Sequence, residues 1–166
     1  MLLHIEEEQP KRYFIGCFGD MHGYACCLVC LHENTLEVLT ERYHSTFVSF
    51  QLIKKAIEDL IKISGESSVE ALFYYDLPSL TDFFEGNDFQ GSKTYVEYLY
   101  PIAFDAEFPA NEILKLQAMV IDKTLVITED LKKELSEYDV YKRRVKRRLC
   151  SVFCVLKDFE KLTGGI

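Results

Sequence analysis

Residues 12–44 of the chain read RYFIGCFGDMHGYACCLVCLHENTLEVLTERYH, and this stretch decides the fold. It contains three runs of strand length, at residues 13–18, 25–31 and 36–43. Gly23 lies in the first link, where glycine supplies the backbone angles of a tight hairpin. Residues 33–35 form a polar turn in the second link. The stretch therefore predicts an antiparallel meander of three strands, with Asp20 directly after the first strand.

The segment after the meander changes from strand to helix periodicity. Apolar residues recur at helical spacing at Leu52, Ile53, Ala56, Ile57, Leu60 and Ile61. Residues 69–75 are then apolar apart from Glu70, which is typical of a central strand covered on both faces. A strand reached through a helix is expected to run parallel to a strand already present, by a right-handed crossover. We therefore predict that residues 69–75 lie beside the first strand.

The rest of the chain predicts further alternation of helices and strands. We expect a short helix at 78–84, a strand at 94–100, a helix from Pro109 to about 121, a β-prone piece at 124–127, a helix from Thr128 and a last helix at about 149–162. Three antiparallel strands, a helix and a parallel central strand follow the ribonuclease-H-like order. The predicted fold is α/β, with a mixed five-stranded sheet and helices on both faces. Residues 1–166 form one predicted domain, with residues 1–11 as a polar lead-in and residues 142–166 as a basic helical segment.

The composition is that of an ordinary globular protein, with 48% hydrophobic and 28% charged residues. No apolar run approaches the ~20 residues of a membrane-spanning helix. Residues 1–12 carry three glutamates where a signal peptide has basic and then apolar residues, so we expect a cytoplasmic location. Six cysteines without an export signal predict reduced thiols.

The net charge of −8 is unevenly distributed. Residues 142–166 hold eight basic and two acidic residues, a net of +6, which leaves 11 basic against 25 acidic residues in the first 141, a net of −14. The basic cluster consists of Lys142, Arg143, Arg144, Lys146, Arg147 and Arg148. Such a cluster on an acidic protein is a candidate contact for the phosphate backbone of nucleic acid. The alternative is a solvated, basic helix face.

Two aspartates follow predicted neighbouring strands. Asp20 closes the first strand and Asp76 closes the fourth. Because the carboxyl ends of parallel neighbours meet at one edge, we expect both carboxylates in one crevice. Close carboxylates repel unless a cation lies between them, and oxygen ligands suit Mg²⁺ or Mn²⁺. A pair of such ions is a common device for in-line attack on a phosphodiester, so the sequence predicts a two-metal nuclease site.

Three segments together resemble the C-terminal nuclease domain of the large terminase subunit of tailed phages. They are residues 13–43, ALFYYDLPSLTDFF at 71–84, and EILKLQAMVIDKTLVITEDLKKELSEYDVY at 112–141. By position, Asp20 and Asp76 match the first two metal-binding acids of the family. The resemblance implies a DNA endonuclease that cuts double-stranded DNA during packaging. It also implies the terminase ATPase domain, the small terminase subunit or the portal as partners, and the host cytoplasm as the location.

The third family acid lies in or just before the final helix, usually in an Asp-His…Asp-Ala stretch that is absent here. Asp158 is the nearest candidate for this third catalytic and metal-binding acid, and Glu160 is the reserve. The ATPase motif GxxxxGK[ST] is also absent, which implies an excised domain or a stand-alone relative. A ribonuclease-H-like domain that loses one acid can persist as a DNA-binding or assembly module. That function stays open as an alternative.

The segment GDMHG at residues 19–23 also resembles the first motif of calcineurin-like metallophosphoesterases, in which Asp20 and His22 would bind a metal. The further signatures of that family, GDxxDRG and GNH[DE], do not occur. A helix is expected after the motif in that family, whereas this sequence predicts strands. An exposed hairpin residue is the alternative interpretation of His22.

Cys27 and Cys30 have the CxxC spacing of zinc sites, with Cys150 and Cys154 as the second pair. Positions 27 and 30 of a strand point to opposite faces, which favours buried thiols. Asp82 on the predicted short helix is a candidate secondary ligand near the crevice.

Overall fold

The computed structural model describes residues 10–20, 22–46, 49–65, 69–75, 78–86, 96–102, 110–137 and 146–157. In chain order the elements are β1 (Arg12–Gly19), β2 (Tyr24–His32), β3 (Thr35–His44), α1 (Phe50–Ile63), β4 (Val69–Tyr75), α2 (Pro78–Gly86), β5 (Val96–Ile102), α3 (Ala110–Ile121), β6 (Leu125–Val126), α4 (Glu129–Ser136) and α5 (Arg147–Leu156). No helix in these ranges is long and apolar enough to cross a membrane.

The strands form one mixed sheet in the order β5-β4-β1-β2-β3-β6. The predicted meander is confirmed, because β1 pairs with β2 and β2 with β3 in antiparallel fashion. The predicted crossover is also confirmed, because β4 lies beside β1 and runs parallel to it. The β-prone piece at 124–127 adds a short sixth strand, β6, which pairs with β3 through Leu36 and Leu125. The sheet is therefore that of a ribonuclease-H-like fold.

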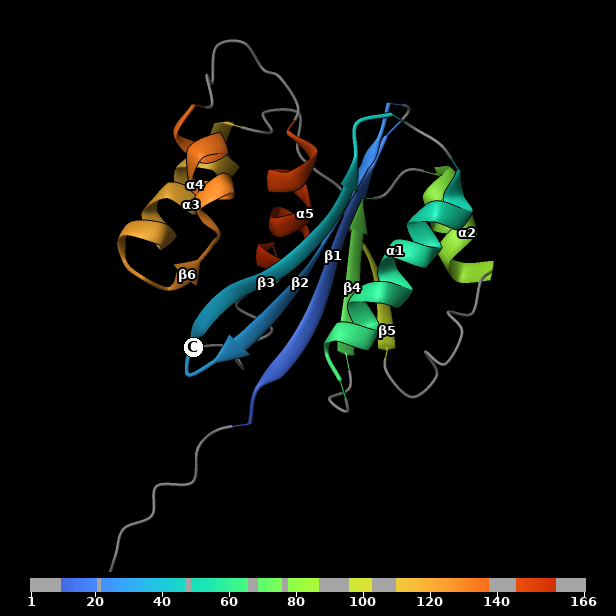
Figure 1. Cartoon of the computed structure of the whole chain (residues 1–166), viewed down its shortest axis with the longest axis horizontal. Helices are drawn as coiled ribbons and strands as arrows, with labels where there is room; N and C mark the ends of the chain where they lie inside the picture. Colours follow the sequence, from blue (N-terminus) through green and yellow to red (C-terminus); the bar gives the residue numbers. More distant parts are fainter. Residues whose placement is uncertain are drawn as a thin grey trace, which may run out of the picture.

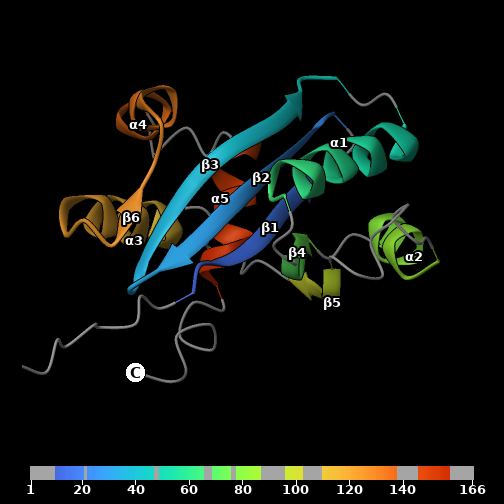
Figure 2. The same cartoon turned by 60° about the horizontal axis from the view of Figure 1, so that its bottom comes forward.

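Helices cover both faces of the sheet, as predicted. Figure 1 shows α1 and α2 on one side and α3, α4 and α5 on the other, and Figure 2 shows α1 in front of the strands with α5 behind them. Alternate residues of β1 serve the two layers. Ile15 and Cys17 pack with α1 and α2, whereas Phe14 and Phe18 pack with α3, α4 and α5. Each face therefore has its own apolar core.

Helix α1 forms because its capping and its apolar stripe agree. Ser49 caps it by accepting a hydrogen bond from the backbone N–H of Leu52. Its buried residues are Ile53, Ala56, Ile57, Leu60 and Ile61, which are the residues of the predicted stripe apart from Leu52. Leu52 lies at the exposed edge of that stripe. Helix α1 thereby covers the meander and leads the chain across to β4.

Helix α5 begins two residues earlier than predicted and is buried along its length from Leu149 to Leu156. It lies directly against the backbone of β1. A Cβ atom built on Gly16 would overlap the carbonyl oxygen of Ser151, so only glycine lets the helix approach this closely. The contact fixes the last described helix on the first strand of the chain.

The close approach at Gly16 predicts a large penalty for adding one methyl group. We expect Gly16→Ala to lower the free energy of unfolding by about 3 kcal/mol or more, because backbone atoms rather than a flexible side chain must move. Gly19→Ala is the matched control, since its added Cβ would meet only the ends of two side chains, those of Leu80 at 3.2 Å and Ile53 at 3.8 Å. Urea denaturation of both variants measures the difference. Equal stability of the two variants would contradict the packing of α5 on β1.

Candidate functional site

Asp20 lies directly after β1, in the turn that leads into β2. Its Oδ1 atom accepts hydrogen bonds from the backbone N–H groups of His22 at 2.8 Å and Gly23 at 3.0 Å. Its own backbone N–H donates to the Gly23 carbonyl oxygen at 3.0 Å. This is the local bonding by which aspartate shapes a tight turn. The same bonds hold the carboxylate in one orientation at the end of the sheet.

A third donor reaches Asp20 from the other end of the chain. The Nε atom of Arg147, the first residue of α5, donates to Asp20 Oδ1 at 2.9 Å. The side chains of Arg147 and Asp20 are 23% and 24% exposed, so the ion pair is partly shielded from water. All three donors converge on Oδ1. Within the described part of the chain no hydrogen bond reaches Oδ2, which is therefore the oxygen open to a further cation.

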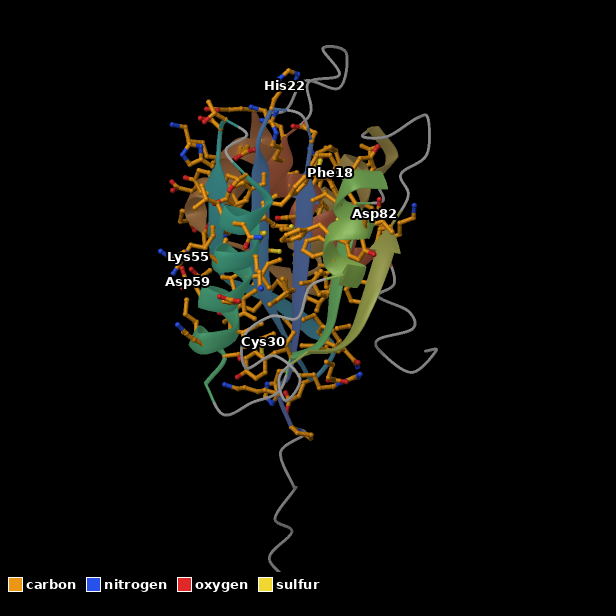
Figure 3. The ribbon with its side chains drawn as sticks, turned by 90° about the vertical axis from the view of Figure 1, so that its right-hand side faces the viewer. Phe18, His22, Cys30, Lys55, Asp59 and Asp82 are labelled. Carbon is orange, nitrogen blue, oxygen red and sulfur yellow. The ribbon has the colours of Figure 1, made fainter. Side chains whose placement is uncertain are left out.

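Gly23 lets three segments meet at this point. A Cβ atom on Gly23 would overlap the carbonyl oxygen of His44, the last residue of β3, and would lie 3.3 Å from Arg147 Nε. The turn between β1 and β2, the end of β3 and the start of α5 are therefore packed together. Figure 3 shows His22 at this end of the sheet and Cys30 toward the opposite end.

The ends of β1 and β4 lie side by side, as the metal-site prediction requires. Their parallel register places Cys17 opposite Tyr74. The rings of Phe18 and Tyr75 stack with centroids 4.7 Å apart. Tyr75 is the residue before Asp76, but Asp76 itself lies outside the described residues, as do Asp158 and Glu160. Within the described ranges, no group of three or more His, Cys, Asp or Glu residues is placed to hold a metal ion.

Within the basic cluster, Lys142, Arg143 and Arg144 lie outside the described residues. Arg148 forms ion pairs with carboxylates of the protein itself. Arg148 donates to both carboxylate oxygens of Glu41, at 3.2 Å and 2.8 Å. Its Nη1 atom lies 3.3 Å from Glu134 Oε2, and its guanidinium sits 4.5 Å from the centre of the Tyr43 ring. The hydrogen bond with Glu41 raises the pKa of Arg148. Burial raises the pKa of Glu134, which Arg148 opposes.

Sequence reasoning missed this ion-pair network. Glu41 sits at a position of β3 that alternation assigns to solvent, yet its side chain is only 7% exposed. The only signal in the sequence is a carboxylate in a strand, far from the basic cluster, and another in the helix before that cluster. Nothing in either local pattern indicates that one arginine pairs with both.

The alternative sites receive less support from the geometry. The chain enters β2 directly after Gly23, as a strand and not as the helix of a phosphoesterase motif. The six cysteines are buried free thiols, and burial raises the pKa of Cys27 to about 12. Cys27 belongs to the core layer that contains α5, whereas Cys30 lines a separate cavity near the start of β1. Asp82 is exposed on α2, as Figure 3 shows.

No protein-family model and no curated protein matches the sequence. Solved structures do match. The human cytomegalovirus terminase nuclease domain superimposes with a TM-score of 0.65 at 6% identity, covering 93% of this chain and 86% of that one. The large terminase of the thermophilic bacteriophage D6E gives 0.59 at 12% identity over 92% of this chain. The fowlpox virus resolvase, in complex with Holliday junction DNA, gives 0.52 at 10% identity over 90% of this chain and 98% of the resolvase.

These likenesses show that the chain has a ribonuclease-H-like fold. Within that class, terminase nuclease domains share its arrangement over more than nine tenths of its length. The predicted resemblance to terminase nuclease domains is thereby confirmed at the level of fold. The chain spans 40% of the length of the phage D6E large terminase.

The Arg148 network predicts unequal costs for removing two arginines. We expect Arg148→Met to lower the free energy of unfolding by about 3–5 kcal/mol, because it leaves the buried Glu41 carboxylate without its partner. Arg12→Met is the matched control. Arg12 also makes a two-bonded pair, with Glu70, but these side chains are 39% and 33% exposed, and such pairs contribute about 1 kcal/mol or less. Chemical denaturation of both variants measures the ranking, and a reversed ranking would contradict it.

Proposed function

We propose that this chain is a metal-dependent DNA endonuclease domain of a DNA-packaging terminase. The observation that supports this most directly is the position of Asp20. Asp20 directly follows β1, whose end lies beside the parallel end of β4, and Asp76 is the next residue after β4. Asp20, Asp76 and Asp158 are the proposed catalytic and metal-binding acids, and Mg²⁺ or Mn²⁺ is the proposed cofactor, with two ions. The similar cytomegalovirus terminase nuclease domains are described as Mn-soaked.

The described donor set suits a divalent cation at Asp20. Two backbone N–H groups and Arg147 fix Oδ1, while Oδ2 receives no hydrogen bond from any residue that the structure describes. A carboxylate oxygen held in one direction is a suitable ligand for a hard cation. When bound, such an ion supplies charge stabilisation and an activated water for attack on the phosphodiester. The residues that hold Asp20 would fix the direction of its carboxylate, and so the position of the ion. Arg147 carries positive charge to the same place.

The substrate of the proposed enzyme is double-stranded DNA. Lys142, Arg143, Arg144, Lys146 and Arg147 are its proposed backbone contacts, with Arg148 holding the start of α5 in place. The fowlpox resolvase of the same fold is described with its DNA substrate bound. The terminase ATPase domain, the small subunit or the portal are the proposed protein partners, in the cytoplasm of the host.

A specific observation favours a second candidate function, a DNA-binding module without catalysis. Arg147 already neutralises Asp20 across 127 residues of sequence. An aspartate with an internal cation and two backbone donors is also a structural tie between α5 and the first turn. In that case Asp20 stabilises the fold, and the basic residues bind DNA without any cleavage.

Cleavage of supercoiled plasmid in Mn²⁺ separates the two functions. For the nuclease, we expect Asp20→Asn and Asp76→Asn each to slow cleavage at least about 100-fold, because a missing metal ligand removes several kcal/mol of transition-state stabilisation. Asp122→Asn, at an exposed position after α3, is the control and should cleave normally. Activity that survives both substitutions would rule out the nuclease. A wild-type protein that binds DNA and never cleaves it would establish the binding module.

The salt dependence of DNA binding tests the basic cluster. We expect replacement of Lys142, Arg143 and Arg144 by glutamine to reduce the magnitude of the slope of log binding constant against log salt concentration by about 2 to 3. Each phosphate that the protein no longer neutralises reduces this magnitude by ~0.9. The control is the same change at Lys54, Lys55 and Lys62 on α1, which removes equal charge from outside the basic cluster. Fluorescence anisotropy with a labelled duplex measures both slopes. If the two triple variants behave alike, the cluster is a solvated face.

A further inference from the structure

A cavity of about 250 Å³ is lined by Arg147, the residue that is bound to Asp20. It is formed by Tyr24 at the start of β2, His44 at the end of β3, and Lys146 and Arg147 at the start of α5. Tyr24 pairs with both Gly19 and His44, so the cavity opens at the same edge of the sheet as Asp20. It is smaller than the about 300–1,000 Å³ of a site for a drug-sized ligand. Its size suits a phosphate group with part of the attached sugar.

Arg147 belongs to both the cavity and the Asp20 site. Its Nε atom is bound to Asp20 Oδ1, while the residue also lines the cavity. No described residue accepts a hydrogen bond from either terminal nitrogen of Arg147. A guanidinium uses its Nε and terminal nitrogens as separate donors of one planar fork. Arg147 is therefore able to hold Asp20 and an anion in the cavity at once.

The basic side chains that line the cavity, Lys146, Arg147 and Arg148, outnumber its one acidic lining residue, Glu134. Asp20 and Glu41, which pair with Arg147 and Arg148, balance the remaining charge. Arg148 and Glu134 line it too, but they are paired with each other, and Arg148 is also bound to Glu41. Lys146 is half-buried and makes no ion pair with any residue that the structure describes. After this pairing, the ammonium of Lys146 and the terminal nitrogens of Arg147 remain as donors for a ligand. Both suit phosphate oxygens.

His44 supplies a ring N–H donor and an aromatic wall. Its Nδ1 atom accepts a hydrogen bond from the backbone N–H of Thr46 at 3.3 Å. An imidazole that accepts at Nδ1 carries its proton on Nε2, which can then donate. The ring lies nearly parallel to Tyr24, with centroids 6.4 Å apart. One side of the cavity therefore combines a hydrogen-bond donor with ring faces of the kind on which nucleic acid sugars and bases pack.

We propose that this cavity binds a phosphate group of a nucleic acid backbone, held by Lys146, Arg147 and His44. The bound phosphate is a neighbour of the phosphodiester presented to Asp20, so the proposal rests in part on the proposed function. It assigns Arg147 as the residue that joins the phosphate site to the acid site. The cavity thereby sets the register of the strand over Asp20.

A second cavity, of about 400 Å³, shows that volume alone does not make such a site. It lies near the start of β1 and is lined by Lys11 together with Glu33 and Glu37. Two carboxylates against one ammonium repel a phosphate group. Lys11 therefore provides a control position with the same charge as Lys146 in a cavity of opposite character.

NMR titration in EDTA tests the proposal without metal or cleavage. The ligands are inorganic phosphate and the dinucleotide TpT, and the readout is the backbone amide signals of Tyr24, His44 and Arg147. We expect saturable shifts with TpT. We expect about tenfold weaker binding for Lys146→Gln and for His44→Phe, as for the loss of one charged or polar hydrogen bond. Lys11→Gln should bind TpT like the wild type.

Three outcomes would overturn the proposal. The first is that TpT gives no saturable shift of the cavity signals in the wild type. The second is that Lys11→Gln and Lys146→Gln weaken TpT binding equally. The third is that inorganic phosphate gives saturable shifts and TpT gives none. The wild-type titration decides the question even where a variant fails to fold. Because no cleavage is measured, a protein that binds TpT but does not cut plasmid would retain the phosphate site and lose only the proposed endonuclease.

Discussion

The ion pair between Arg147 and Asp20 depends on α5 lying across β1, and the candidate site depends on that pair. The contact of Gly16 with Ser151 sets the crossing point. From there the strand runs four residues to Asp20, about 13 Å at a strand's rise. The helix runs four residues back to Arg147, about 6 Å at a helical rise. The long arginine side chain spans the difference. A glycine in the first strand and an arginine in the last described helix thus act together, although neither predicts the other.

Much of the fold could be predicted from the sequence because the local spacing of apolar residues indicates its strands and helices. The meander of 12–44 and the stripe of α1 repeat at the spacing of their own structure, and the crossover rule then places β4 beside β1. Asp20 at a strand end was predicted on the same basis. The partner of Asp20 could not be, because an ion pair across 127 residues has no period. The pairing of β6 with β3 could not be predicted either, because a strand of two residues has too short a sequence pattern to indicate its neighbour.

The basic cluster shows how a run of like residues divides its roles once it enters a helix. Arg147 and Arg148 are adjacent, so their side chains leave α5 about 100° apart. One reaches the turn after β1, and the other reaches β3 and α4. The second arginine pairs with two carboxylates that the fold holds largely away from water, and so it contributes to stability. Charge counted along the sequence therefore overstates the charge that a nucleic acid meets, and the cavity beside Arg147 depends on Lys146 and on the terminal nitrogens of Arg147.

The charge balance at Asp20 distinguishes the two candidate functions. A single carboxylate that already faces a guanidinium gains less from a divalent ion than a bare one does, because the two cations repel. A phosphate group in the neighbouring cavity changes that balance. Its oxygens bind the terminal nitrogens of Arg147, and its negative charge offsets the repulsion between Arg147 and the metal ion. In the proposed nuclease, binding of the backbone and binding of the metal ion are therefore coupled through Arg147, and the coupling is reciprocal. In a binding module the same arginine needs no ion, and its affinity for the backbone is independent of metal concentration.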